Sequence, residues 1–594
     1  MLRPFTVTLL STSTMDGTTI RREIGDLLFE RGQITEKQLE LARRRQERLH
    51  IPQHKAIIDL NLASEEAVYR ALAELNHLSY QDVSDSAPAK NVLDAVPVKL
   101  IFHYRMFPVS LENDVLTIAV AEPLQPLEQG NLRLQLGKRI RFVLTSPSCL
   151  NVAIRKHFGL GAATIQKLRE SRSRDDASQE IVFDVKATDD SAVTDPTIID
   201  FVDQLLAEAL RLQATDIHIE PYFSTVRLRY RIDGIMQTVP TPDGLRQLYG
   251  SIVSRLKIMA GLNIAEKRLP HDGHIAMKTN GEEYDLRISI IPTKHGEAVC
   301  LRILGRQNLF LDVSQLGMEP RHEALFKEMI QLPQGLILLT GPTGSGKTTT
   351  LYAALTHAND ESRKILTIED PVEYQLPGAT QIQVRDDIGL TFSSAIRSIL
   401  RHDPDIILVG EIRDAETAEI AIRAAQTGHL VFATLHTNDS ISAVTRLLEM
   451  KIDAFLIGSS LVCSIAQRLA RRVCRHCITE DTAIPDSIRE EMAAALKISP
   501  SEVKAFKGKG CVECNHNGYR GRVALYEFFV MNEALADAIT PDVKTGTLRQ
   551  LAVQHGWRSL REEAWNKVQN GVISIEEQQR LTRRINSVAL PQTV

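Results

Sequence analysis

Short apolar runs punctuate the second half of the chain and predict the buried strands of a sheet. They fall within residues 335–340, 405–410 and 430–435, and nearly continuous apolar residues are typical of strands covered on both faces. The segment 349–357 that follows the first run has the pattern of a helix. Because strand, loop and helix follow one another, the pattern predicts an α/β domain built on a parallel sheet.

The N-terminal part of the chain carries a different pattern, in which two similar helix pairs precede a small α/β unit. Apolar faces predict helices within 24–29 and 35–48, and a second copy over 56–76 gives a repeat of about 29 residues. Alternating apolar residues at 106–111 and 115–120 predict a β-hairpin. We therefore expect a helical domain joined to a small sheet.

Changes of pattern divide the chain into several domains, so we predict an α/β multidomain protein. A polar stretch that mixes both signs of charge is typical of a flexible linker. The predicted segments are a disordered leader (1–20), a first N-terminal domain for docking (21–160), a linker (161–194), a second N-terminal domain (195–305) and a strand-and-helix domain (306–594) with a cysteine-rich part at about 470–520.

The end of the chain, from Gly518 onward, is predicted to be mostly helical. Three arginines precede it at Arg468, Arg471 and Arg472. We expect this basic cluster on a solvated helix face; the alternative is contact with a membrane surface or with an acidic loop of a partner.

Composition and charge exclude two classes of partner contact. The net charge of −4 at pH 7 produces no overall positive field, so nothing indicates nucleic acid or an anionic membrane as a partner. No stretch approaches the roughly 18 apolar residues of a transmembrane helix, and residues 1–19 lack the apolar core of a signal peptide. We expect a cytoplasmic protein that associates with a membrane only indirectly, through partners.

A phosphate-binding loop follows the first apolar run. The sequence Gly341-Pro342-Thr343-Gly344-Ser345-Gly346-Lys347-Thr348 matches G-x-x-x-x-G-K-[ST] between a predicted strand and a predicted helix. Backbone N–H groups of such a loop surround phosphate oxygens, and the helix N-terminus adds partial positive charge. We predict that these eight residues and Thr349 bind a nucleotide, with Lys347 on the β- and γ-phosphates and the Thr348 hydroxyl on Mg²⁺.

Acidic residues and histidines follow the later strands of the predicted sheet. Glu411 ends the run at 405–410, where a carboxylate beside a P-loop holds Mg²⁺. Glu373 follows another predicted strand and can orient and deprotonate an attacking water. His429 and His436 bracket the strand at 430–435. Because the carboxyl ends of parallel strands meet at one edge, we expect the two carboxylates near the nucleotide. His436, at the end of its strand, could report the γ-phosphate through a hydrogen bond, and the pair of histidines around this strand favours a functional role for both.

Arginines on the second N-terminal domain are candidate sensors of a triphosphate. Arg287 and Arg302 lie on predicted strands just before the P-loop domain. The alternative interpretation is a solvated sheet face with ion pairs, and residue types alone leave both open.

Two C-x-x-C pairs predict a metal site. They are Cys474, Cys477, Cys511 and Cys514. Four thiolates suit a tetrahedral zinc ion and leave no open position for catalysis. The long spacing between the pairs predicts a helical insertion at about 486–496.

Together these motifs resemble the GspE/PilB group of the secretion superfamily ATPases, which drive type II secretion and type IV pilus assembly. The resemblance is densest at 264–273, 340–354 and 367–472. It implies a PAS-like second domain and a RecA-like ATPase domain with a zinc subdomain and a helical C-terminal region. It also implies site roles: Glu373 as catalytic carboxylate, Glu411 as Walker B residue, His429 and His436 as the His box, and Arg287 and Arg302 as arginine fingers.

The resemblance further implies a homohexamer that uses ATP, Mg²⁺ and Zn²⁺ and works with inner-membrane platform and cytoplasmic adaptor proteins. We favour a motor for type II secretion over one for type IV pilus assembly. A motor responsive to cyclic di-GMP is a less favoured alternative, because the helical repeat has Glu23 where binding relatives have an arginine, and His54 and Asn61 where they have glycines.

Overall fold

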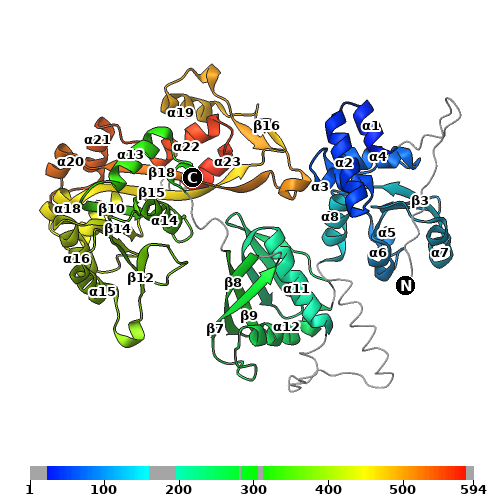
Figure 1. The fold of residues 1–594 in the computed structure, drawn as a ribbon, viewed down its shortest axis with the longest axis horizontal. Helices are drawn as coiled ribbons and strands as arrows, with labels where there is room; N and C mark the ends of the chain where they lie inside the picture. Colours follow the sequence, from blue (N-terminus) through cyan, green and yellow to red (C-terminus); the bar gives the residue numbers. More distant parts are fainter. Residues whose placement is uncertain (1–22, 160–195, 243, 280–281, 306–311, 583–594) are drawn as a thin grey trace, which may run out of the picture. The chain divides into compact units, whose positions relative to one another are not determined.

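The computed structural model describes residues 23–159, 196–242, 244–279, 282–305 and 312–582. The chain forms two compact units (Figure 1). The first unit comprises Met1–Met277 and Asp285–Ile303, and the second comprises Lys278–Tyr284 and Leu304–Val594. The predicted leader at 1–20 and linker at 161–194 lie outside the described residues. Among the described helices, none combines the length and apolar character needed to cross a membrane.

The first unit begins with the two predicted helix pairs. They are α1 (Ile24–Glu30), α2 (Glu36–Leu49), α3 (Gln53–Asp59) and α4 (Glu65–Leu75). The side chain of Thr35 caps α2 by accepting a hydrogen bond from the Gln38 backbone, and Ser64 caps α4 in the same way. These caps confirm the helix starts that the sequence predicts.

A three-stranded sheet follows the helix pairs. Its strands are β1 (Met106–Glu112), β2 (Val115–Val120) and β3 (Arg139–Leu144), with β1 antiparallel and β3 parallel to β2. The predicted hairpin is therefore confirmed. The accompanying helices are α5 (Lys90–Leu93), α6 (Val98–Tyr104), α7 (Pro126–Leu136) and α8 (Pro147–Phe158).

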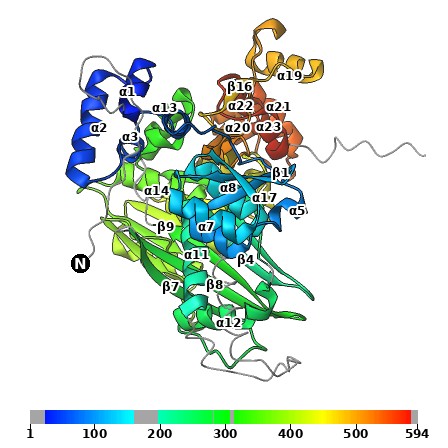
Figure 2. The same ribbon diagram turned by 90° about the vertical axis from the view of Figure 1, so that its right-hand side faces the viewer.

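A six-stranded sheet with two helices completes the first unit. Its order is β6-β5-β4-β9-β8-β7, and Figures 1 and 2 show the two helices side by side on one face of it. The elements are α11 (Pro196–Arg211), β4 (Ala214–Pro221), β5 (Val226–Ile232), β6 (Ile235–Val239), α12 (Leu245–Met259), β7 (His271–Thr279), β8 (Glu282–Thr293) and β9 (Gly296–Gly305).

The second unit is built on a seven-stranded sheet of order β12-β11-β13-β14-β10-β15-β18. Each neighbouring pair is parallel except β15 and β18. The strands are β10 (Gly335–Thr340), β11 (Ile365–Glu369), β12 (Ala379–Gln383), β13 (Ile406–Val409), β14 (Leu430–Leu435), β15 (Leu461–Val473) and β18 (Tyr519–Val530).

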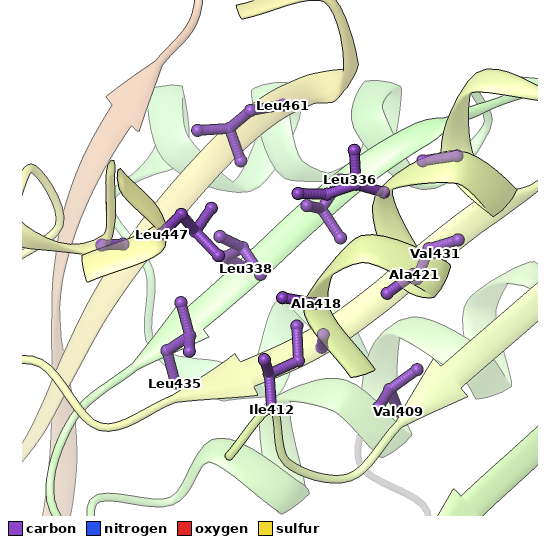
Figure 3. Close-up of a cluster of buried hydrophobic side chains, with 14 of the residues drawn as sticks. Leu336, Leu338, Val409, Ile412, Ala418, Ala421, Val431, Leu435, Leu447 and Leu461 are labelled. Atoms are coloured by element: carbon purple, nitrogen blue, oxygen red, sulfur yellow. The ribbon is translucent and has the colours of Figure 1, made fainter. Parts of the chain in front are cut away.

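Both faces of this sheet are buried, as the continuous apolar runs predict. Leu336 and Leu338 of β10 join a core with Ala418 and Ala421 (Figure 3), whereas Ile337 and Leu339 face a second core. The covering helices are α13 (Pro320–Ile330), α14 (Lys347–Ala358), α15 (Phe392–Ile399), α16 (Ala415–Gln426), α17 (Ser442–Glu449) and α18 (Ala454–Ser460).

The structure corrects the prediction for the end of the sheet. Residues 461–473 and 519–530 form the two longest strands of the unit, where the sequence predicted a basic helix face and a mostly helical chain end. Arg468, Arg471 and Arg472 have the spacing of neighbours on a helix, which is why the sequence suggested a helix. The pairing of β15 with β10 and β18 overrides this local helical pattern, because strand preference depends on the surrounding sheet.

The segment between β15 and β18 holds the four cysteines and the predicted helical insertion. It consists of β16 (Ile478–Glu480), α19 (Asp486–Leu496) and β17 (Phe506–Gly508), which confirms the helix. The predicted C-terminal helices are also present after β18, as α20 (Glu533–Asp537), α21 (Thr545–Gln554), α22 (Leu560–Gln569) and α23 (Ile575–Thr582).

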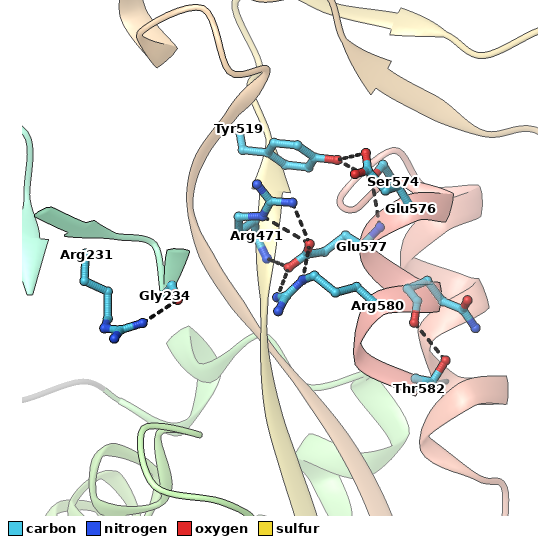
Figure 4. A network of polar contacts seen from close by, with 10 residues as sticks. Arg231, Gly234, Arg471, Tyr519, Ser574, Glu576, Glu577, Arg580 and Thr582 are labelled. Carbon is cyan, nitrogen blue, oxygen red and sulfur yellow. Dashed lines mark hydrogen bonds and ion pairs between the residues drawn. The ribbon is translucent and has the colours of Figure 1, made fainter. Parts of the chain in front are cut away.

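A buried ion-pair network attaches α23 to β15. The Glu577 carboxylate is fully buried and accepts hydrogen bonds from the Arg471 side chain at 2.9 Å, the Arg471 backbone at 2.9 Å and Arg580 at 2.6 Å (Figure 4). The Arg471 guanidinium also lies over the Tyr519 ring. The buried negative charge is thus matched by two cations, which stabilises this packing.

Glu577→Gln is expected to loosen α23, because it leaves the largely buried Arg471 without a countercharge. Removing one partner of a buried ion pair costs about 3 kcal/mol or more, so amide hydrogen exchange in α23 should accelerate by about a hundredfold. The matched control is Glu576→Gln, because Glu576 is exposed on the same helix. Equal exchange rates in the two variants would contradict the role of this network.

Candidate functional site

The P-loop lies between the carboxyl end of β10 and the start of α14. Gly341 and Gly346 have positive φ angles of 147° and 89°. A Cβ on Gly341 would lie 2.6 Å from the Gln467 backbone oxygen, and one on Gly346 would lie 2.9 Å from the Gln467 amide nitrogen. These glycines are required both by the backbone conformation and by the close approach of β15.

Lys347 lies within the loop that precedes it. Its Nζ donates to the backbone oxygen of Gly341 at 2.7 Å. Burial lowers the pKa of Lys347 to about 8; Glu411 opposes that shift, and Arg468 adds to it. The Ser345 hydroxyl is buried and has no hydrogen-bond partner in the described part of the chain. A cation and an unsatisfied hydroxyl in a glycine-lined loop fit an anionic ligand such as a phosphate.

The two threonines that follow Lys347 lie in the first turn of α14. Thr348 and Thr349 are both partly buried there. Burial raises the pKa of Tyr374, and a hydrogen bond with the Thr349 side chain opposes that shift. Tyr374 directly follows Glu373, so Thr349 contacts the loop that carries the predicted catalytic carboxylate. The structure thus gives the Thr349 side chain a partner in the protein, whereas the sequence predicted only nucleotide binding for it.

Two predicted site residues meet at the same edge of the sheet. Glu411 lies just after β13 and His436 just after β14, and the His436 Nε2 is 3.1 Å from a Glu411 oxygen. The second Glu411 oxygen lies 2.9 Å from Arg413. Because β14 pairs with β10 in parallel, the structure brings both groups to the carboxyl edge that carries the P-loop.

Glu373 lies in an exposed position on the loop that follows β11. A buried network holds this loop: Gln381 donates to the Tyr374 backbone oxygen at 3.1 Å and accepts from the Leu376 backbone at 2.7 Å. Gln381 also donates to Glu369, a buried carboxylate that accepts from the Tyr352 hydroxyl as well.

Sequence reasoning did not identify Glu369, Tyr352 and Gln381 as supporting residues of the site. The available signal was a glutamate that closes an otherwise apolar strand, Ile365–Glu369. Its partners come from a helix and from a separate strand, so no local pattern could reveal them.

His429 lies at the opposite edge of the sheet. Its Nδ1 is 2.9 Å from the Ala424 backbone oxygen at the end of α16, and its own backbone oxygen accepts from Gly335 at the start of β10. At about 3.3 Å per residue, the strand separates His429 from His436 by about 23 Å. The structure therefore does not bring His429 to the P-loop of its own chain.

The two candidate sensor arginines belong to the other compact unit. Arg302 on β9 is exposed, and its Nε donates to Asp216 at 3.2 Å. The same carboxylate lies 3.3 Å from Arg231 on the opposite neighbouring strand. Arg287 lies on β8, next to β9 in the sheet. The expected ion pairs of a sheet face are thus present for Arg302.

The four cysteines meet between β15 and β18. Their Sγ atoms lie within 4.8 Å of one another, with separations of 3.8 Å for Cys474 and Cys511, 3.8 Å for Cys477 and Cys514, and 3.7 Å for Cys511 and Cys514. A tetrahedral zinc ion with Zn–S bonds of about 2.3 Å requires sulfur separations of about 3.8 Å. The thiols are not joined as disulfides.

Glycines allow the two cysteine turns to approach each other. A Cβ on Gly508 would lie 2.1 Å from the Gly518 backbone oxygen, and one on Gly510 would lie 2.7 Å from that of His516. Backbone N–H groups of Cys511 and Gly518 donate to the Cys514 sulfur. Such bonds stabilise a thiolate, the form that binds a metal.

Comparison with known proteins agrees with this architecture. The family model described as "Type II/IV secretion system protein" matches residues 191–580, and the "MshEN domain" model matches residues 76–164. The chain is 37% identical to the "Type IV pilus assembly ATPase PilB" of Myxococcus xanthus over 93% of this chain and 98% of that protein.

Relatives from type II secretion are similarly close. The chain is 36% identical to the "Type II secretion system protein E" of Xanthomonas campestris over 96% of this chain and all of that protein. It is 45% identical to the "Type II secretion system protein HxcR" of Pseudomonas aeruginosa over 68% of this chain and 80% of that protein. The chain therefore belongs to the type II/IV secretion system protein family and is an ATP hydrolase.

Proposed function

We propose that this protein is an ATPase motor that drives pseudopilus assembly and protein export in a type II secretion system. The main support is the meeting of Lys347, Glu411 and His436 at one sheet edge in a chain with secretion ATPase relatives. Assembly of type IV pili is the alternative, because the PilB relative also spans nearly the whole chain. Response to cyclic di-GMP is a less favoured addition, which rests on the helical repeat within residues 24–76.

Each group at the P-loop edge has a proposed task. Residues 341–349 bind the phosphates of ATP, and the Lys347 ammonium meets the charge that develops on the γ-phosphoryl group. Mg²⁺, held by Thr348 directly and by Glu411 through water, would neutralise phosphate charge. Glu373 removes a proton from the attacking water. His436 holds Glu411 in place through the 3.1 Å contact between its Nε2 and a Glu411 oxygen.

Thr349 has two parts to play in this proposal. Its backbone N–H lies in the first turn of α14 and points toward the N-terminus of the helix. The partial positive charge at that N-terminus favours the binding of phosphate. Its side chain stays with Tyr374, which would keep the loop of Glu373 close to the bound nucleotide.

The remaining predicted residues take roles outside this edge. We assign Arg287 and Arg302 as arginine fingers that approach the triphosphate of their own or a neighbouring subunit. Arg302 would then exchange its pairing with Asp216 for a phosphate contact. His429, at the far edge of the sheet, contacts no nucleotide of its own chain in this proposal.

The proposed assembly is a homohexamer with RecA-like P-loop domains and PAS-like second domains. It works in the cytoplasm, peripheral to the inner membrane, through platform and adaptor proteins of the secretion or pilus machine. Deleting the gene, restoring it, and assaying both exoproteins and surface pili tests the choice of system. Loss of pili with normal exoprotein release would overturn the type II assignment.

Glu373→Gln is expected to lower kcat for ATP about a hundredfold or more, which is the usual contribution of a general base. Affinity for a non-hydrolysable ATP analogue should stay within about threefold, because Glu373 lies on a loop outside the phosphate cradle. The matched control is Glu361→Gln, an exposed glutamate before β11, which should leave kcat unchanged. Full activity of Glu373→Gln would show that another group activates the water.

ATP affinity is expected to weaken as pH rises through about 8. In the free protein, burial places the pKa of Lys347 at about 8, and bound phosphates would raise it. Only the ammonium form attracts phosphate, so Kd for an ATP analogue should increase by up to about tenfold per pH unit above 8. Calorimetry between about pH 7 and 9.5 measures this slope. Lys347→Gln should bind more weakly and with no slope in this range; a flat wild-type profile would refute the assignment.

We propose that Cys474, Cys477, Cys511 and Cys514 hold a structural zinc ion. Metal analysis of the purified chain should find one zinc per chain. Cys477→Ser should lose the metal and make the segment 474–518 more sensitive to protease, because the site links two turns that have little core of their own. Cys300→Ser is the control, since Cys300, on β9, is not one of the four clustered cysteines. Full zinc content in Cys477→Ser would exclude this ligand set.

A further inference from the structure

Strand β15 brings an arginine against the phosphate-binding loop. β15 pairs with β10 in parallel, with Ala466 opposite Thr340, so the residues after Ala466 run alongside the loop. A Cβ on Gly341 would lie 3.0 Å from Nη1 of Arg468. The positive charge of Arg468 also contributes to the lowered pKa of Lys347. The guanidinium therefore lies beside the first residue of the phosphate cradle.

The same guanidinium reaches the loop that carries His436. Its Nη1 donates to the Gln467 backbone oxygen at 2.9 Å, and its Nη2 donates to the Asn438 backbone oxygen at 2.9 Å. Asn438 lies two residues after His436, which contacts Glu411. In the described part of the chain, both hydrogen bonds of this side chain go to backbone carbonyls rather than to a carboxylate. Burial lowers the pKa of Arg468, and the nearby carboxylates of Glu527 and Asp439 oppose that shift. An anion in the adjacent cradle would compete with these two carboxylates for the same positive charge.

The far end of the His436 loop is fixed to β18. Glu527 is 3% exposed, and one of its oxygens accepts from the Ser440 backbone at 2.8 Å and the Ser440 hydroxyl at 2.6 Å. Its other oxygen accepts from the Leu560 backbone at 2.7 Å. Asp439 lies 3.3 Å from Arg549. Residues 439–440 are therefore anchored to β18 and its neighbours. Asn438, closer to His436, is instead held by Arg468, which lies beside the P-loop.

We propose that Arg468 is a positioning residue that couples phosphate in the P-loop to the loop carrying His436. A phosphate beside Gly341 attracts the guanidinium and competes with its bond to Asn438. Any shift of Arg468 then changes the position of the His436 loop and of the contact between His436 and Glu411. The planar guanidinium can hold two acceptors at once, which a lysine ammonium with a single nitrogen cannot do in the same geometry.

This inference rests on the proposed ATPase function, and hydrogen exchange tests the coupling directly. In the wild type, a non-hydrolysable ATP analogue should change amide exchange both in the P-loop and at residues 436–441. In Arg468→Gln, the P-loop should keep its response while residues 436–441 lose theirs. We expect kcat to fall about tenfold or more with KM changed less than about threefold, the pattern of a group that acts after binding.

Arg472→Gln is the control, because Arg472 is an arginine of the same strand, four residues farther from the P-loop. It should retain the wild-type kcat and both exchange responses. Arg468→Lys keeps the positive charge but should still lose the exchange response at residues 436–441. This variant tests the inference if Arg468→Gln fails to fold.

Two results would overturn the inference. An unchanged response at 436–441 in Arg468→Gln would show that the loop is positioned without Arg468. Loss of the P-loop response as well would make Arg468 a direct binding group. A wild type that neither binds nor hydrolyses ATP would instead refute the proposed function itself, so the two failures are distinguishable.

Discussion

The pairing of β15 with β10 is the contact on which the phosphate-binding edge depends. It places Gln467 against the P-loop so closely that Gly341 and Gly346 have no room for a Cβ. The Gln467 side chain also accepts a hydrogen bond from Thr350 in the first turn of α14. Strand, loop and helix are thereby held against one neighbour, which fixes the cradle before any ligand binds.

Buried carboxylates fix the loops that complete the site. Glu369 holds the loop after β11 through Tyr352 and Gln381, and Glu527 holds the loop after β14 through Ser440. Taking a carboxylate out of water is costly unless hydrogen-bond donors replace the water. Several donors surround each of these two groups, so each binds its loop in one arrangement. Burial accordingly raises the pKa of Glu527.

The two long strands also link the site to the cysteine cluster. β15 runs from the P-loop edge to Cys474, and β18 returns from Gly518 to Glu527, which anchors the His436 loop. A metal that joins the two cysteine turns would fix the outer ends of both strands. This continuity of sheet gives the distant cysteines a mechanical connection to the edge that carries the P-loop.

Only the tertiary structure decided the features that depend on pairing between distant segments. Residues 461–473 became a strand, although their arginines are spaced as on a helix, because they pair with β10 and β18. His429 lies away from the P-loop because strand direction sets its edge. Contacts such as Thr350 to Gln467 join residues 117 positions apart. No local pattern encodes such a contact, since it exists only once the sheet has assembled.

The sequence by itself determined the features whose signals are local. The P-loop, the strands at 335–340 and 430–435, the helix caps at Thr35 and Ser64, and the helix between the cysteine pairs all depend on residues close together in the chain. The positions of Glu411 and His436 at the ends of apolar runs belong to this class, and the rule that parallel strands share a carboxyl edge then predicts that they lie close together. Thr349 stands between the two classes: its place at the helix start is local, whereas its bond to Tyr374 needed the folded sheet.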